Sequence, residues 1–437
     1  MHPSSAGSPS HRPGPGLQIR PFRALTYRHR DPAYLARVSS PAYDLVTPAG
    51  RDRLADADPH NVVRLILPRV DVPTGRNGSS TQLAAATLHQ WQADGVLERD
   101  DVPALWLYDL APADGGAVTS GWLGAVTLPP PESTAVLPHE DTFPDAVEGR
   151  RALLAATGTD LEPIVLAHDP EPALTEIGAA VRSAPPTLEL TDADGVRHRL
   201  WRVTDLEVVT TVREALERTD AVIADGHHRF AAARAHARTE RGAGGSDAVL
   251  ALVTPMGAGG LRVDPIHRVV PELTLESAVA SAAAGFVTAE VPVEDGSTPD
   301  AVAVAARRWL ADPAERGFLL TDGRRLVRLT APSQEVRDAV PAEAPPAWRD
   351  LDVVLAHHGL IGRLWQRPDT VDSIVIAHGL EDALRGAVRS NGVALLLRAP
   401  SPTDVAAVAR AGARMPRKST LFVPKPRTGL VFRPLAD

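Results

Sequence analysis

The sequence predicts a mixed α+β fold in a chain of 437 residues. Strand-like and helix-like patterns alternate along the chain, as in α+β and irregular α/β proteins. The composition, 44% apolar and 23% charged, is that of an ordinary globular protein. The sequence has neither a Gly-x-Gly-x-x-Gly turn after a strand nor a Walker-type Gly-Lys-Ser loop. The two commonest nucleotide-binding folds therefore have no support.

Apolar runs bounded by turn residues define the elements of the first half. Asn61–Leu67 (NVVRLIL) is almost continuously apolar and ends at a proline, which predicts a buried strand. Thr81–Ala93 has helical spacing and stops at Asp-Gly. Further expected elements are strands at Leu105–Tyr108 and Ala125–Leu128 and a hairpin at Thr187–Val203.

The second half continues the mixture and contains the clearest strand-to-helix junction. Ala221–Ala224 is typical of a short strand, and an alanine-rich helix is expected to follow it. The Pro-rich stretch Pro332–Pro346 is the strongest linker candidate. Later expected elements are helices at Ala301–Ala311, Asp352–Trp365 and Pro402–Ala413 and a hairpin at Phe318–Leu329.

Composition excludes several kinds of chemistry. The chain has no cysteine, so it cannot form disulfides, thiolate metal sites or iron–sulfur clusters, and it has no thiol nucleophile. No apolar run approaches the roughly 20 residues needed to cross a bilayer, and the N-terminus lacks a secretory signal. We therefore expect a cytoplasmic protein without membrane attachment. The net charge of −8 argues against nucleic acid as a partner.

Charge is unevenly distributed along the chain. Arg410–Asp437 holds seven Lys/Arg and one acidic residue, so the rest of the chain carries a net charge of −14. Such a segment is most often a solvated face. The alternative is that it supplies cations to a small phosphorylated ligand.

The stretch IADGHHRFAAARAH, which begins at Ile223, places two histidines and an arginine directly after Asp-Gly. We take Asp225 as the helix N-cap, which puts Gly226 and both histidines in the first turn. Backbone N–H groups there lack partners within the helix and attract anions. Gly226 permits close approach of a phosphate, and Arg229 can bind its oxygens in a bidentate manner. Either histidine can donate a hydrogen bond or carry a proton near neutral pH.

Two other interpretations of this stretch stay open. A strand–turn–helix junction with Asp and Gly is a routine structural device, and short motifs recur by chance. A zinc site would combine the histidine pair with His139-Glu140. However, adjacent histidines diverge on a helix and lack the i, i+4 spacing of zinc-binding helices, so we rank zinc below phosphate.

The same stretch resembles the signature of the DUF1015 family, a bacterial and archaeal family without an assigned function. Further blocks match in the family's order and extend the resemblance over most of residues 19–431. They are Ser40–Asp44, His60–Pro68, Pro138–Glu140, Asp264–Arg268 and Arg414–Lys425 followed by Thr428-Gly429. Two positions depart from the family. Asp141 stands where a basic residue is usual, and Gly149 stands where an aspartate precedes the family's arginine.

A more distant resemblance suggests a function. The Gly-His-His-Arg segment is similar to a turn of the ParB/sulfiredoxin superfamily, in which Gly-x-x-Arg at a helix start holds nucleotide phosphates. Sulfiredoxins carry a cysteine where this chain has His227, so reduction of a sulfinic acid is excluded on chemical grounds. The branch with Asp-Gly-His-His-Arg includes free-serine kinases, which phosphorylate L-serine with ATP or ADP. With this resemblance we expect a disordered tail (1–16), a ParB/sulfiredoxin-like nucleotide-binding catalytic region (17–270) and an additional α/β region (271–437).

The resemblance implies roles for particular residues in a serine-kinase-like reaction. Phosphoryl transfer needs held phosphates and an oriented hydroxyl, with Mg²⁺ bridging phosphates and one or two carboxylates. Glu140 is our first choice for the carboxylate that accepts the substrate proton and Asp44 the second, with His227 and His228 as further catalytic candidates. The nucleotide is expected to bind at Asp225, Gly226, His227, His228, Arg229, Arg268, Lys418, Ser419 and Thr420. The hydroxy amino acid is expected to bind at Arg64, His139 and His267.

Structural alternatives accompany these assignments. A carboxylate in a turn and an ion-paired arginine in an apolar strand are common without function, and Lys418–Thr420 is equally consistent with a protected edge strand. Two other functions compete with the kinase. One is a ParB-like nucleotide-binding regulatory module associated with DNA, and the other is a phosphohydrolase that uses a histidine. We also expect Arg229→Ala to abolish nucleotide binding while leaving the melting profile nearly unchanged.

Overall fold

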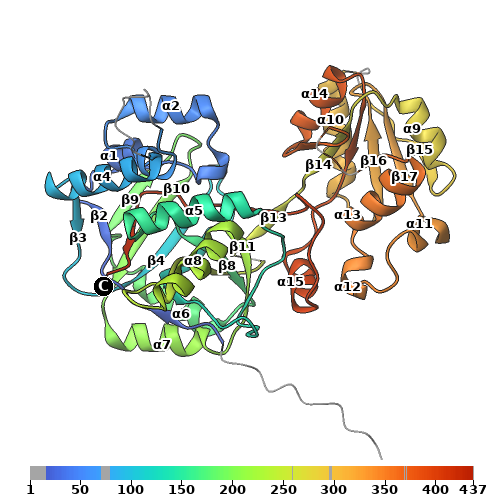
Figure 1. Cartoon of the computed structure of the whole chain (residues 1–437). Helices are drawn as coiled ribbons and strands as arrows, with labels where there is room; N and C mark the ends of the chain where they lie inside the picture. The colour runs from blue at the N-terminus through green and yellow to red at the C-terminus, as the bar shows by residue number, and fades with distance from the viewer. Residues whose placement is uncertain are drawn as a thin grey trace, which may run out of the picture. The chain divides into compact units, whose positions relative to one another are not determined.

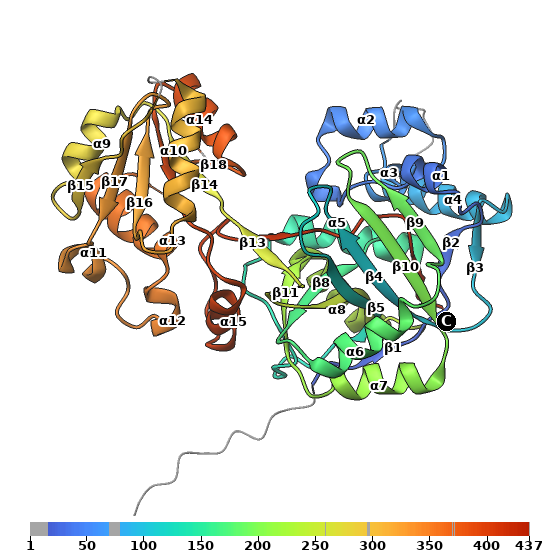
Figure 2. The ribbon, with the colours of Figure 1, turned by 180° about the vertical axis from the view of Figure 1, so that it is seen from behind.

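The computed structural model describes residues 16–69, 79–257, 259–294, 298–368, 370 and 372–436. Helices and sheets are mixed throughout these residues, which confirms the predicted α+β class (Figures 1 and 2). Of the predicted tail, residues 1–15 lie outside the described residues. No helix in the described ranges is long and apolar enough to span a membrane.

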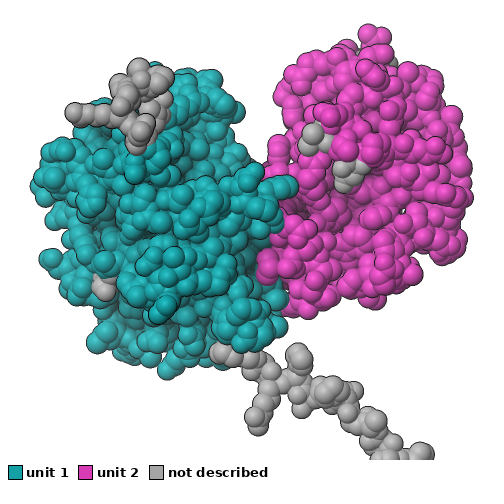
Figure 3. All heavy atoms as spheres, in the orientation of Figure 1, with its two compact units in different colours: residues 1–137, 142–260, 425–437 teal, residues 138–141, 261–424 magenta. Residues whose placement is uncertain are grey.

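The chain folds into two compact units, which Figure 3 colours separately. Unit 1 comprises residues 1–137, 142–260 and 425–437, and unit 2 comprises residues 138–141 and 261–424. Neither unit is one stretch of sequence. The regions expected from the sequence, 17–270 and 271–437, are each continuous. The return of residues 425–437 to unit 1 could not be predicted, because such a return leaves no local signal in composition.

Unit 1 is built on a mixed sheet, nine-stranded in its described part, with the order β6-β11-β8-β12-β5-β4-β10-β9 and β1 beside β5. Two short ladders pair β2 with β3 and β7 with β21. The strands are β1 (Ile19–Arg20), β2 (Leu25–Tyr27), β3 (Leu97–Arg99), β4 (Leu105–Ala111), β5 (Thr119–Thr127), β6 (Val136–Leu137), β7 (Thr159–Asp160), β8 (Ile164–His168), β9 (Leu188–Thr191), β10 (Arg197–Val203), β11 (Ala221–Asp225), β12 (Ala248–Pro255) and β21 (Arg433–Pro434). The helices are α1 (Pro32–Val38), the 3₁₀ turn η1 (Tyr43–Leu45), α2 (Pro48–Ala57), α3 (Val63–Ile66), α4 (Ser80–Ala93), α5 (Pro144–Thr157), α6 (Pro172–Val181), α7 (Leu206–Leu216) and α8 (His227–Glu240).

The large sheet of unit 1 has an apolar core on each face. In β4, Trp106 and Tyr108 pack into one core, while Leu105 and Leu107 pack into the other, as the two-residue repeat of a strand requires. Helices α1, α3, α4 and α5 contribute to the first core, and α6, α7 and α8 to the second. Strand β11, which leads into the predicted phosphate turn, is thereby held in a sheet that is buried on both faces.

In the described part of unit 2, six strands form an antiparallel sheet with the order β15-β17-β16-β19-β14-β18, and β13 pairs with β20. Helices α10 and α14 pack on this sheet through residues such as Trp309 and Leu384. The strands are β13 (Arg262–Asp264), β14 (His267–Val270), β15 (Val287–Glu290), β16 (Phe318–Thr321), β17 (Leu326–Thr330), β18 (Val375–Ala377), β19 (Val393–Leu396) and β20 (Leu421–Val423). The helices are α9 (Leu275–Ala282), α10 (Pro299–Ala311), α11 (Gln334–Asp338), α12 (Pro346–Arg349), α13 (Asp352–Leu355), the π-helix η2 (Ala356–Leu364), α14 (Leu380–Arg389) and α15 (Pro402–Arg410).

Most predicted elements are present, but the strand predicted at Asn61–Leu67 is wrong, because these residues form the short helix α3. Oδ1 of Asn61 accepts a hydrogen bond from the backbone N–H of Val63 at 2.9 Å and so begins the turn. Val63, Leu65 and Ile66 are all buried. A short run that is apolar on every side fits a buried helical turn as well as a buried strand.

The Pro-rich stretch Pro332–Pro346 is not a linker between the units, because it lies within unit 2. Ser333 caps α11 there through the backbone N–H of Val336, whose side chain is fully buried. Pro346 begins α12, a position at which the missing N–H of proline has no cost. A proline that starts a helix, such as Pro346, gives the same compositional signal as a proline in a linker.

Candidate functional site

The predicted phosphate turn joins β11 to α8 through Gly226. This residue is the N-cap of α8 and has φ 93° and ψ 29°, a left-handed conformation. A Cβ atom at this position would lie 2.8 Å from Cγ2 of Ile164. Both the backbone angles and the crowding therefore require glycine. Among the described residues no side chain caps α8, which is a helix start of the kind that can accept an anion.

The prediction that Asp225 caps α8 is wrong. Asp225 is the last residue of β11, and its carboxylate pairs with the guanidinium of Arg229 and, at 2.6 Å, with Nζ of Lys425. Nζ of Lys425 also lies 2.5 Å from Oδ2 of Asp44 in η1. The carboxylate thus pairs with two cations instead of accepting from the backbone N–H groups of the first turn. We call Asp44, Asp225, Arg229 and Lys425 the charged cluster.

Burial and mutual attraction decide the protonation of the charged cluster. Burial alone lowers the pKa of Lys425, but Asp225 and Asp44 outweigh it and raise that pKa above its ordinary value. Burial alone raises the pKa of Asp44, but Lys425 and Arg229 together outweigh it and lower that pKa. The lysine and the aspartate therefore both remain charged at neutral pH.

The side chain of Arg229 is 11% exposed and makes its contacts within the protein. Its Nη1 donates to the carbonyl of Pro163 at 2.5 Å, its Nη2 donates to Asp225, and its Cζ lies 5.6 Å from the centre of the Tyr43 ring. Its Nε has no partner among the described residues. Because of these contacts we now expect Arg229→Ala to lower stability, so this substitution alone cannot report on nucleotide binding.

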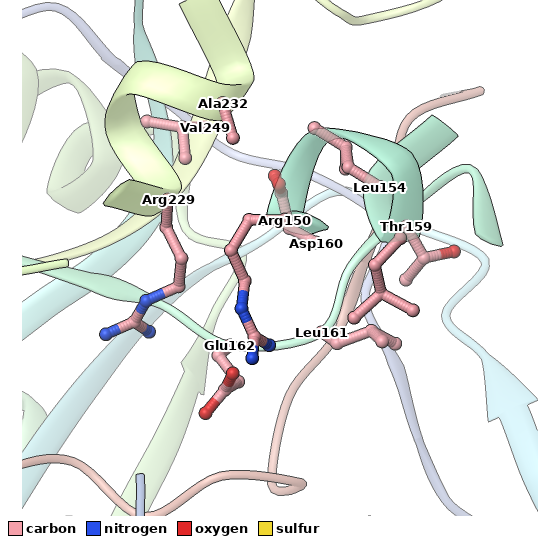
Figure 4. A pocket seen from close by; sticks show the side chains of 10 residues that line it. Arg150, Leu154, Thr159, Asp160, Leu161, Glu162, Arg229, Ala232 and Val249 are labelled. Carbon is pink, nitrogen blue, oxygen red and sulfur yellow. The ribbon is translucent and has the colours of Figure 1, made fainter. Parts of the chain in front are cut away.

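A small cavity of about 40 Å³ lies beside Arg229 (Figure 4). Figure 4 shows the side chains of Arg150, from α5, and Arg229, from α8, extending alongside one another in the region that also holds Glu162. Oε1 of Glu162 accepts hydrogen bonds from the backbone N–H of Tyr43 and from Oγ1 of Thr428, each at 3.0 Å. A cavity of this size holds one or two water molecules but no nucleotide.

The two histidines of the motif diverge, as adjacent helical residues do. His227 is buried, whereas His228 is partly exposed. Nε2 of His228 accepts a hydrogen bond from the backbone N–H of Phe143 at 3.1 Å, and the two rings stack. Across the described ranges no cluster of three His, Cys, Asp or Glu side chains is arranged to hold a metal ion.

A second group of predicted site residues lies in unit 2, around Thr420. Nε2 of His139 lies 2.9 Å from Oγ1 of Thr420, which donates to Oε1 of Glu140 at 3.1 Å. These residues come from opposite ends of the unit's sequence, and the pairing is one of the contacts that join residues 138–141 to the rest of unit 2. His139 is buried, and Glu140 is partly exposed.

Other predicted ligand-binding residues of unit 2 have structural contacts. Arg268 is fully buried, and its guanidinium donates to Nε2 of His357 at 3.0 Å and to the carbonyl of Lys418 at 2.9 Å. His267 accepts from the backbone N–H of Leu397, and burial together with Arg268 lowers its pKa to about 4. These contacts favour structural roles.

Of three further predicted residues, two have local partners and the third, Lys418, is exposed. Oγ of Ser419 donates to the carbonyl of Pro416 at 2.6 Å. Lys418 is exposed and has a positive φ of 53°. In unit 1, Nη2 of Arg64 donates to the carbonyl of Ala55 at 2.7 Å.

Sequence reasoning missed four residues that lie in or around the charged cluster: Lys425, Tyr43, Arg150 and Glu162. Lys425 is one of only two lysines in the chain and belongs to the basic C-terminal segment. That composition was the one available signal. The pairing of Lys425 with Asp44 spans 381 positions, so no local pattern could reveal it.

The chain belongs to the family described as protein of unknown function DUF1015, which it matches over residues 19–354. No curated protein matches it significantly. Among solved structures, a free serine kinase in complex with AMP is 15% identical, with 68% of this chain and 88% of that chain covered and a TM-score of 0.30. SbnI from Staphylococcus aureus with a C-terminal truncation is 14% identical, with 71% and 87% covered and a TM-score of 0.35. A conserved hypothetical protein from Pyrococcus furiosus is 15% identical, with 68% and 90% covered and a TM-score of 0.30. TM-scores of this size establish no shared fold, so function is argued below from the chain's own residues.

Proposed function

We propose that the chain is a nucleotide-dependent phosphotransferase that acts on the hydroxyl group of a small molecule, with free L-serine or a similar hydroxy amino acid as acceptor. The observation that carries this proposal is the position of Lys425. Its ammonium bridges Asp44 and Asp225, and Asp225 immediately precedes Gly226, the N-cap of α8. A cation, a carboxylate and an anion-attracting helix start are thus close together, and these are the parts that phosphoryl transfer needs.

The phosphates of ATP or ADP would bind at Gly226, His227 and His228, where the start of α8 favours negative charge. An ammonium group has three N–H donors, and Asp44 and Asp225 accept from two of them. The third donor of Lys425, for which the structure shows no acceptor among the described residues, would bind a phosphate oxygen. Arg229 would add positive charge from below the turn and hold Asp225 in place.

Asp44 is the carboxylate that we propose as the acceptor of the substrate proton. It is the more exposed member of its ion pair, since 37% of its side chain is accessible and only 9% of that of Lys425. Because Lys425 keeps Asp44 ionised, the carboxylate can accept a hydrogen bond from an attacking hydroxyl group. Glu140, our first choice from sequence, is hydrogen-bonded to Thr420 in unit 2 and becomes the alternative to be tested.

Mg²⁺ would be carried mainly by the nucleotide. The described residues offer no cluster of three potential metal ligands, and Mg²⁺ at phosphoryl-transfer sites is commonly held by phosphates, waters and one or two carboxylates. The ion would neutralise charge on the phosphates.

The test is to incubate the purified protein with L-serine, Mg²⁺ and either ATP or ADP and to measure phosphoserine by mass spectrometry. We expect Asp44→Asn to reduce its formation about 100-fold or more, because general bases contribute about 10²–10⁴-fold. Asp94→Asn, an exposed change at the end of α4, is the matched control and should leave the rate unchanged.

Other outcomes would overturn the proposal or its base. Release of phosphate without any requirement for serine would indicate a phosphohydrolase, and nucleotide binding without turnover would indicate a regulatory module. If Glu140→Gln abolishes transfer and Asp44→Asn does not, the base is Glu140 and the role given to the charged cluster is wrong.

A further inference from the structure

Unit 1 contains a second and larger cavity, of about 440 Å³, lined by residues of η1, α2, α3, the start of α4 and α5. Its polar lining consists of Tyr43, Arg51, Arg69, Ser80, Thr81 and Arg150, and most of the other lining residues are apolar. We call it the arginine pocket. Its volume lies within the range of small-molecule binding sites, which is about 300–1,000 Å³.

Among the described residues that line the arginine pocket, three are arginines and none is acidic. Arg51 and Arg69 share one carboxylate, that of Asp52, at 3.3 Å and 2.8 Å. Arg150 has no ion-pair partner among the described residues. Its Nη1 donates to the carbonyl of Ile66 at 3.1 Å, and its Cζ lies 3.8 Å above the Tyr43 ring. Among the described residues, Asp52 is thus the one carboxylate within ion-pair distance of these three guanidinium groups.

Burial makes this imbalance significant. The side chain of Arg51 is only 9% exposed, and Arg150 is half-buried. Guanidinium groups that are removed from water without a matching anion are costly, and an oxyanion bound between them would lower that cost. Arginine also binds phosphate and carboxylate groups in a bidentate manner.

The start of α4 adds to the positive electrostatic potential of the arginine pocket. Ser80 and Thr81 form the first turn of this 14-residue helix and line the pocket. Ser79 caps the helix by accepting from the backbone N–H of Gln82 at 3.3 Å. The positive end of the helix dipole and two side-chain hydroxyl groups thus lie beside the three arginines.

From this arrangement we infer that the arginine pocket binds a small ligand with more than one negative charge, carried by phosphate or carboxylate groups on a partly apolar skeleton. The oxyanions contact Arg51, Arg69 and Arg150, and the skeleton packs on the apolar lining that includes Leu67 and Leu153. The inference does not depend on the proposed kinase activity. Tyr43 belongs to this pocket and is also contacted by Arg229 of the charged cluster, so the two sites adjoin.

Calorimetry with two probes tests the inference and distinguishes the sources of the charge. Inorganic pyrophosphate represents a phosphorylated ligand, and citrate represents a polycarboxylate. We expect at least one of them to bind, and Arg150→Gln and Arg69→Gln each to weaken that binding about tenfold or more, as loss of a charged hydrogen bond does. Arg69 is 42% exposed, so its substitution leaves the fold intact.

Arg151→Gln is the matched control, because Arg151 follows Arg150 on α5 but pairs with Glu148 on the surface. The inference is overturned if neither probe binds, or if binding is the same in the Arg69, Arg150 and Arg151 variants. The titrations are repeated with Asp44→Asn. Retained probe binding in that variant, together with an absence of phosphoserine in the wild type, would refute the kinase proposal and leave the pocket standing.

Discussion

Replacement of Lys425 with methionine is the sharpest test of the charged cluster. Methionine keeps the unbranched apolar part of the side chain and removes the ammonium that lies 2.5 Å from Asp44 and 2.6 Å from Asp225. The only other lysine of the chain is Lys418, which is exposed. Lys418→Met is therefore a matched control for the chemistry of the substitution.

The expected magnitude follows from burial. Removing one partner of a buried ion pair costs about 3–5 kcal/mol, because the other charge is left uncompensated. Asp225 is 13% exposed but keeps Arg229 as a partner, and Asp44 is 37% exposed, so water screens part of its charge. We expect a loss near the lower limit, about 3 kcal/mol in the free energy of unfolding of unit 1.

Hydrogen exchange at increasing urea concentration measures this loss within one unit. Peptides from β12, a central strand of the large sheet, report the opening of unit 1 without assuming that both units unfold together. A loss of about 3 kcal/mol moves the midpoint by roughly 1 M urea. In the Lys425→Met variant, a second substitution, Asp44→Asn, should restore part of the lost free energy of unfolding, because it removes the carboxylate charge that is left without its lysine. Equal stability of the Lys425→Met and Lys418→Met variants would refute the buried ion-pair network.

Two further predictions concern backbone and titration. Gly226→Ala should cost more than about 1 kcal/mol, since φ is 93° and the new Cβ would meet Ile164 at 2.8 Å. Gly149 lies within α5, and a Cβ added there would have no described neighbour within 4 Å. Gly149→Ala should therefore raise the melting temperature slightly, because alanine favours a helix more than glycine does. His267 has a folded pKa of about 4, below its unfolded value, so the neutral form contributes stability at high pH that is lost as the pH falls from about 6.5 towards 4. Urea titrations across this range should show that His267→Gln, which removes the imidazole, makes the loss shallower; an unchanged slope would contradict the assignment.

The parts of the site that could be predicted from sequence are those with local causes. Gly226 follows a short apolar strand and precedes an alanine-rich segment, so both the junction and the start of α8 were predictable. The role of Asp225 could not be predicted, because a local pattern shows that an aspartate can cap a helix but not which distant cation it pairs with. Its actual partner, Lys425, lies 200 positions later in a segment whose composition indicated no more than positive charge.

The fold was predictable to the extent that each element has its own pattern. The hairpin β9–β10 and helix α4 have clear turn and capping residues, and both are present. Asn61–Leu67 has no periodicity, and burial on every side makes a helical turn and a strand look alike. Residues 138–141 belong to unit 2 and bond to distant residues there, such as Thr420, which pairs with His139 from 281 positions away. Such pairings are not encoded locally.

The lysine at position 425 matters both for the stability of the charged cluster and for the proposed phosphoryl transfer. Two of its 46 basic residues are lysines, so arginine is the ordinary cation of this protein. A guanidinium is a planar fork suited to one carboxylate, whereas a compact ammonium can approach two carboxylates from different directions and keep a third donor. At position 425 both carboxylates lie within 2.6 Å of one nitrogen, a geometry that arginine cannot reproduce. Since Lys425 arrives with the final segment of the chain, the cluster is complete only when residues 425–437 have joined unit 1.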